Sequence, residues 1–259
     1  MATATAVQTG RNVLHVRGDW SARDDRIPSA VWLGILWIAM IAGFGVDFPG
    51  FVQQVPPPPK VIWVHAFVFT VWMFVLTAQV LMVLGDRVAW HRKFGWFAIF
   101  WASIMAVLGP WAAIASEVVR PYGPLGPPFL AVNLVDITGF LALLAWGVML
   151  RKNPAAHRRM MILSTVALAD PGFARFSIWL LPMHAPSPAV WFCHLFYGNV
   201  LLVGLMAAWD WRRGRLMRSF VIGAAALLAS EVLAAFLYFW GPWHSVTTAF
   251  IAACARLHI

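Results

Sequence analysis

Long apolar stretches separated by short polar turns dominate the chain between residues 30 and 240. Each stretch approaches the roughly 20 residues of helix that a bilayer core of about 30 Å requires. The stretches are continuous and do not alternate residue by residue, which favours helices over the strands of a barrel. The pattern predicts seven transmembrane helices, at residues 30–46, 61–84, 94–115, 129–150, 160–181, 189–209 and 220–240.

The last six of these helices pair into three hairpins, and each hairpin turns on a short basic loop. The loops lie at residues 85–94, 151–159 and 212–218. The predicted fold is therefore an all-α polytopic membrane bundle of one helix followed by three hairpins. Its expected parts are a polar arm, the membrane domain and an interfacial tail, at residues 1–29, 30–240 and 241–259.

Basic residues are distributed very unequally between the two ends of this predicted bundle. The arm holds four, the first loop three and each of the other loops four, so that 15 of the 19 Lys and Arg residues share one end. The other end has only Lys60, Arg120 and Arg256. Because basic loops remain in the cytoplasm, the N-terminus is predicted to be cytoplasmic and the C-terminus to lie outside.

Composition agrees with this assignment and narrows the function. The chain is 61% hydrophobic and 11% charged, which is too apolar for a water-soluble protein of 259 residues. Its net charge of +9 is explained by topology and by attraction to anionic lipid, so no nucleic-acid partner is expected. No P-loop, nucleotide-binding fingerprint, nucleophile elbow or Cys-x-x-Cys motif occurs.

Candidate functional residues are the polar side chains inside the predicted spans. An ionisable group in hydrocarbon is costly unless it faces a partner or a cavity. The conspicuous ones, all expected in the outer half of the bilayer, are His65, Asn133, Asp136, Asp170, Arg175, His194 and Glu231. Because they come from several spans, they predict one central site that faces the extracytoplasmic side.

Three acidic residues are the candidates for catalytic or proton-transfer groups: Asp136, Asp170 and Glu231. Asp170 precedes Pro171 and Gly172, a pair that interrupts helical hydrogen bonding and could make room for a substrate or cofactor. In this interpretation Asp170 accepts a proton. The alternative is a buried ion pair between Asp170 and Arg175.

Histidines are the candidates for cofactor ligands. His65 and His194 are expected at similar depths, where they could bind a haem iron or a transition metal, or could simply bond to water or backbone. His91 and His157 in the basic loops form a second possible pair, with neighbouring arginines binding haem propionates. The alternative is that these loops are topology signals that contact lipid phosphates.

Two of the basic turns carry a resemblance. The Trp90–Trp96 turn, with its His-Arg-Lys, and the Ala156–Met161 turn, with its His-Arg-Arg, each open a span. They resemble those of uncharacterised bacterial multi-span membrane proteins, and the resemblance implies the same fold and a bacterial inner (cytoplasmic) membrane. In outline, two histidine pairs are also similar to transmembrane cytochromes b, although the even histidine spacing of those proteins is missing.

These observations leave three functions open. The first is a membrane redox protein that binds haem b or another metal and exchanges electrons with quinone. The second is a metal-dependent membrane enzyme acting on a lipid or apolar small molecule. The third is a proton-coupled carrier, with a partner in a membrane complex as a further interpretation.

Overall fold

In the computed structural model, the described residues are 13–14, 24–120, 125–180 and 187–257. This part of the chain is almost entirely helical. Six stretches are long and apolar enough to cross a membrane: Arg26–Val52 (α2), Lys60–Leu84 (α3), Val88–Val119 (α4), Pro127–Lys152, Pro188–Arg212 (α8) and Arg218–Phe239 (α9). The fourth stretch consists of η1 (Pro127–Phe129), α5 (Leu130–Met149) and η2 (Leu150–Lys152). The predicted all-helical fold is confirmed, and six of the seven predicted spans have the length and composition of membrane-crossing helices in the described part of the chain.

The predicted span at residues 160–181 is not one continuous helix. Two short helices occupy this region, α6 (Pro154–Val166) and α7 (Asp170–Leu180), of 13 and 11 residues. Neither alone reaches the length needed to cross a bilayer. Asn153 caps α6 by accepting a hydrogen bond from the Ala156 backbone N–H at 3.2 Å, and Pro154 occupies its first turn, where proline is well tolerated.

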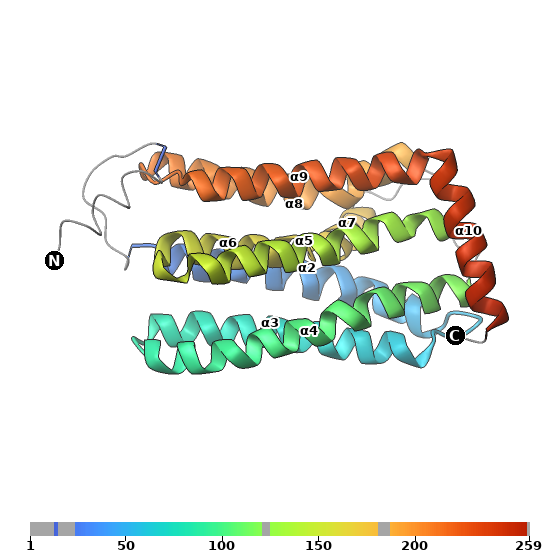
Figure 1. The fold of residues 1–259 in the computed structure, drawn as a ribbon, viewed down its shortest axis with the longest axis horizontal. Coiled ribbons are helices and arrows are strands. Elements are labelled where there is room, and N and C mark those ends of the chain that lie inside the picture. Colours follow the sequence, from blue (N-terminus) through green and yellow to red (C-terminus); the bar gives the residue numbers. More distant parts are fainter. Residues whose placement is uncertain (1–12, 15–23, 121–124, 181–186, 258–259) are drawn as a thin grey trace.

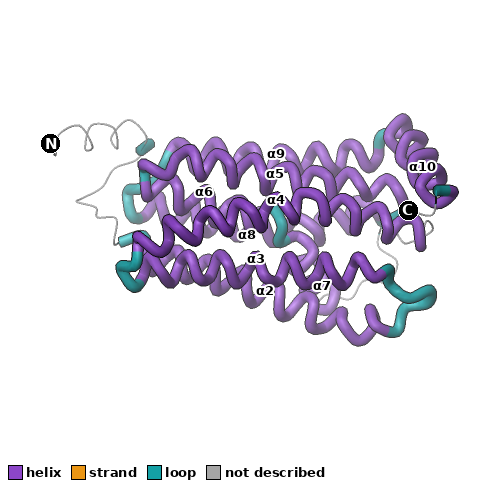
Figure 2. Tube along the Cα trace, turned by 60° about the horizontal axis from the view of Figure 1, so that its bottom comes forward, coloured by secondary structure: helices purple, strands orange, loops and turns teal. Residues whose placement is uncertain are grey.

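The helices lie side by side in three tiers (Figure 1). One tier holds α8 and α9, the middle tier holds α2, α5, α6 and α7, and the third holds α3 and α4. The turned view in Figure 2 shows the same long bundle of aligned helices from another side. α6 is its central element, because its residues from Met160 to Val166 are nearly all buried.

The outer surface of the bundle is apolar. Ile38 on α2, Val107 on α4 and Val232 on α9 are all exposed, although each belongs to a candidate membrane span. Large exposed apolar side chains promote aggregation in water, whereas in a bilayer they contact lipid chains. A lipid environment therefore accounts for the apolar outer surface of the bundle.

All three basic turns lie at one end of the bundle (Figure 1). Arg26, at the start of α2, donates a hydrogen bond to Asp86 of the first basic turn at 2.6 Å. Most of the predicted arm lies outside the described residues, but Leu14 donates its backbone N–H to Leu216 near the third turn at 2.8 Å. The shared placement of the basic turns agrees with the charge pattern.

The opposite end carries α10 (Gly241–Arg256), which runs across the ends of the other helices (Figure 1). The Trp243 indole N–H donates to the Pro128 carbonyl at 2.9 Å and anchors this helix to η1. Most of the predicted tail at residues 241–259 therefore forms one helix, α10. The two cysteines, Cys193 and Cys254, are free thiols.

Candidate functional site at a broken helix

The central feature of the site is the interruption between α6 and α7. The backbone N–H groups of Leu168 and Ala169 bond three residues back, to Thr165 and Val166, so the helix tightens and stops there. Pro171 then has no N–H and cannot continue the α6 ladder, but it fits the first turn of a new helix. The sequence Asp170-Pro171-Gly172 therefore starts α7, and the predicted interruption is confirmed.

Asp170 occupies the first turn of α7 and is fully buried, at 0% exposure. Neither of its carboxylate oxygens has a hydrogen-bond partner among the described residues. A buried carboxylate without a cation or a donor is strongly disfavoured as an anion. At this position the group is therefore suited to hold a proton.

The structure brings the other two predicted acidic residues to the same place. Asp136 on α5 and Glu231 on α9 both lie within electrostatic range of Asp170. Packing around Gly139 shows how these elements meet, since a Cβ there would lie 3.9 Å from both the Ala167 Cβ and the Ser230 Oγ. The cluster thus joins α5, α9 and the helix interruption.

Asn199 of α8 completes this cluster, and the sequence analysis missed it. Its Nδ2 donates to Glu231 Oε1 at 2.9 Å, and both side chains are buried. The Asn199 Oδ1 has no donor within the described part of the chain. An amide in the middle of an otherwise apolar span was the signal that could have identified it.

Arg175 does not pair with Asp170, so the alternative interpretation of the two residues as a buried ion pair is wrong. Its Nε donates to Asp47 Oδ2 of α2 at 2.8 Å, and its Nη1 donates to the Pro171 carbonyl at 3.0 Å. The guanidinium also lies 4.7 Å from the ring centroid of Phe44. Arg175 therefore ties α7 to the C-terminal part of α2, and Asp170 has no counter-ion among the described residues.

His65 and His194 have separate surroundings in the structure. His65 stacks on Phe69 of its own helix, with ring centroids 4.0 Å apart. His194 on α8 shares a hydrogen bond of 3.0 Å with Ser177 of α7. Each histidine thus has its own neighbours, and binding of one metal by both stays a prediction.

His91 and His157, in contrast, approach each other, with ring centroids 6.0 Å apart and nearly perpendicular planes. The His157 Nδ1 donates to the Gly147 carbonyl at 2.8 Å, which leaves a lone pair on Nε2. When the Gln79 side-chain amide is oriented to match its neighbours, its NH2 group lies 2.5 Å from His91 Nδ1. It then donates a hydrogen bond to the lone pair of that His91 nitrogen. Binding of one iron by both rings would require Gln79 to turn away or His91 to change tautomer.

The described residues contain no group of three or more His, Cys, Asp or Glu side chains arranged to hold a metal ion. The site is instead an array of hydrogen-bonding and proton-exchanging groups. Comparison with protein-family models, curated proteins and solved structures finds no match for the chain. Its function is therefore inferred from the geometry of this array.

Proposed function

We propose that the protein is a proton-coupled membrane carrier in which Asp170 is the proton-exchanging group. The observation that carries the proposal is the fully buried carboxyl of Asp170 at the first turn of a short helix, which has no hydrogen-bond partner in the described part of the chain. Interrupted helices with ionisable groups near mid-membrane are typical of the coupling sites of carriers. Asp136, Glu231 and Asn199 supply further groups that can receive or stabilise the proton.

The coupling follows from what ionisation does to packing. With a proton, Asp170 is neutral and compatible with the dry interior. Without it, the carboxylate repels Asp136 and Glu231 and requires water or a donor, so a different position of α7 becomes favourable. The interruption at residues 167–169 is the point at which α7 can move while α6 stays packed.

The proposal includes seven crossings, with α6 and α7 together forming the fifth. Their combined 24 residues and the intervening three residues are sufficient for one crossing. The basic turns then lie in the cytoplasm, the N-terminus is inside and α10 lies at the outer interface. A bacterial inner membrane is the proposed location, on the basis of the resemblance of the two basic turns.

Infrared difference spectroscopy of the protein in lipid tests the role of Asp170. The wild type should show a protonated carboxyl band near neutral pH that responds to a rise in pH, and Asp170→Asn should lose it. Asp86→Asn is the matched control, because Asp86 is exposed and its positive φ of 56° is tolerated by Asn. A band that persists unchanged in Asp170→Asn would disprove the assignment.

A haem-containing redox protein is the second candidate, and the approach of His91 and His157 is the observation that favours it. Imidazoles from two helices are suitable axial ligands for haem iron. An absorption spectrum of the purified protein with and without reductant tests this candidate. A reducible Soret band that disappears in His157→Ala would support it, whereas a featureless visible spectrum would count against it.

A further inference from the structure

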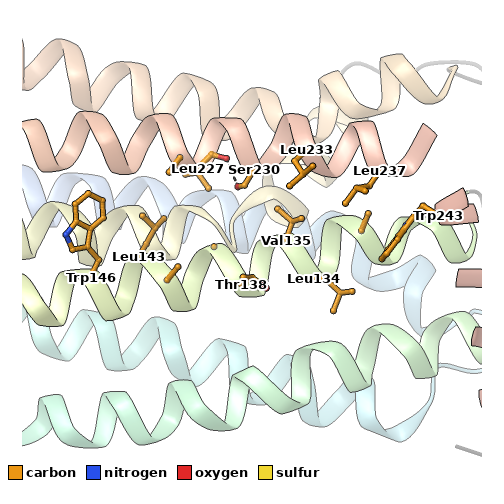
Figure 3. Close-up of a pocket in the computed structure, with 14 residues that line it drawn as sticks. Leu134, Val135, Thr138, Leu143, Trp146, Leu227, Ser230, Leu233, Leu237 and Trp243 are labelled. Carbon is orange, nitrogen blue, oxygen red and sulfur yellow. Dashed lines mark hydrogen bonds between the residues drawn. The ribbon is translucent and has the colours of Figure 1, made fainter. Parts of the chain in front are cut away.

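A groove of about 420 Å³ lies between α5 and α9 and is shown in Figure 3. Trp146 lies at one end and Trp243 of α10 at the other, and aliphatic side chains such as Leu143 and Leu233 form most of the wall. Its volume falls in the range of about 300–1000 Å³ typical of small-molecule sites. None of the described residues that line it is charged. Both helices that form the groove belong to candidate membrane spans.

Two hydroxyl groups interrupt this apolar lining, on Thr138 and Ser230. The Ser230 Oγ donates its proton to the Leu227 carbonyl at 2.7 Å, so towards the groove it presents only acceptor lone pairs. A ligand that bonds to Ser230 must therefore be a donor. A hydroxyl group meets this requirement and can also accept from Thr138.

The groove and the carboxylate cluster are built from the same turns of α5 and α9. Val135 and Ser230 line the groove, and their next neighbours along the chain are Asp136 and Glu231. Gly139, which also lines it, faces Ala167 at the helix interruption. A molecule in the groove therefore contacts the same helix turns that hold the proton-exchanging groups.

We propose that this groove binds a single-chain apolar molecule that carries one hydroxyl group and reaches the site from within the bilayer. The hydrocarbon chain lies between Trp146 and Trp243, and the hydroxyl donates to Ser230. As the substrate of the carrier, this molecule rests on the proposed function. As a bound ligand it stands on the shape and polarity of the groove alone.

Photolabelling in lipid nanodiscs tests the binding site, with a long-chain alcohol that carries a diazirine in its chain as the probe. Label should map to peptides from α5 and α9. Ala142→Phe and Ala226→Phe fill the groove from exposed positions and should lower labelling about tenfold. Ala145→Phe and Ala225→Phe are matched controls, since these alanines are exposed on the same helices but lie outside the groove, and labelling should not change.

The role of the hydroxyl group is tested by Ser230→Ala and by a methyl ether of the same probe. Loss of one neutral hydrogen bond should lower labelling by the alcohol about two- to tenfold. Labelling by the ether should be weaker in the wild type and insensitive to this substitution. If the groove-filling and control variants were labelled equally, the probe would be contacting the protein only as part of the surrounding lipid. That result would overturn the proposal.

A measurement of proton release distinguishes ligand binding in the groove from proton coupling. Adding the alcohol to wild-type protein in weak buffer should change the pH, and Ala226→Phe and Asp170→Asn should both abolish the change. If Asp170→Asn still binds the probe but wild-type protein releases no proton, the groove is confirmed as a ligand site and proton coupling is wrong. If no variant affects labelling, the ligand site itself is wrong.

Discussion

Arg159 of α6, at the end of the bundle that carries the basic turns, makes the densest set of polar contacts in the described structure. Its guanidinium binds Asp210 through Nε at 2.6 Å and Nη2 at 2.8 Å, and Asp25 through Nη1 at 2.7 Å. A further bond goes from Nη1 to the Ala155 carbonyl at 3.0 Å. Burial lowers the pKa of nearby Arg215 to about 10, so Arg215 remains a cation at neutral pH and offsets the second carboxylate.

Replacing Arg159 should therefore destabilise the protein strongly. Arg159→Met leaves the two buried carboxylates of Asp25 and Asp210 without their shared cation, which should lower the free energy of unfolding by about 3–5 kcal/mol. Arg159→Lys keeps the charge but loses the paired geometry and should lie between wild type and Arg159→Met. Unfolding by SDS in mixed micelles measures the effect.

Arg151→Met is the control for this series, because Arg151 is an exposed arginine of the same basic loop that bonds only to a backbone carbonyl in the described structure. It should unfold like the wild type. Similar losses in Arg151→Met and Arg159→Met would mean that general positive charge at this end, and not the buried network, sets the stability.

The sequence indicated which residues were unusual but not which charged residues would form ion pairs. Asp170 and Arg175 are five residues apart, so on one helix they point about 140° away from each other, and Arg175 instead reaches Asp47. Asp25 and Asp210 are separated from Arg159 by 134 and 51 residues, so nothing local in the sequence pairs them. Partner choice depends on how each helix is rotated, and hydrophobic patterns in lipid-facing helices specify that rotation weakly.

α7 is the element on which the proposed coupling depends, and glycines set its position. Gly43 of α2 faces Gly172, and a Cβ added at Gly43 would overlap the Gly172 carbonyl. On its other side, Phe173 fills the space where Gly198 of α8 lacks a side chain. Close approach through small residues is a common way for membrane helices to pack, since apolar side chains gain little there by leaving lipid.

A methyl group at Gly43 should therefore displace α7. Gly43→Ala should lower the free energy of unfolding by about 1–3 kcal/mol through overpacking, and the shift of α7 should also alter the infrared carboxyl band of Asp170. Gly45→Ala is the matched control, because a Cβ at Gly45 of the same helix meets nothing within 4 Å. It should leave stability unchanged or raise it slightly, as Ala favours helix interiors over Gly. Equal effects at both positions would show that helix propensity, and not the contact with α7, decides the outcome.

At the scale of the whole molecule, the apolar pattern predicted most of the architecture. The spans expected at 61–84 and 220–240 agree closely with α3 and α9, because continuous apolar runs bounded by polar turns leave little freedom. The expected first span, 30–46, is extended at both ends to Arg26–Val52. Its C-terminal end includes Asp47, which bonds to Arg175 of α7, and the helix-breaking residue Pro49.

The path of α6 and α7 decides the topology of the whole chain. If they cross together, Asn153 and Ser187 lie on opposite sides of the membrane, and the basic end of the bundle is cytoplasmic as its charge requires. If they do not, both residues lie on the same side. Fusions of a cytoplasmic fluorescent reporter and an external phosphatase after Asn153 and after Ser187 should therefore report inside and outside, respectively.

Cysteine labelling of the full-length chain checks the same prediction without truncation. In a background with Cys193→Ser and Cys254→Ser, Ser187→Cys should react with a membrane-impermeant maleimide added outside intact cells, because Ser187 is an exposed N-cap residue of α8. Arg213→Cys, exposed at the basic end, is the matched control and should react only after the membrane is permeabilised. Protection of Ser187→Cys in intact cells, together with its reaction after permeabilisation, would place both ends of the α6 and α7 segment on one side. Asp170 would then lie on a re-entrant segment, where its proton could exchange with one compartment only.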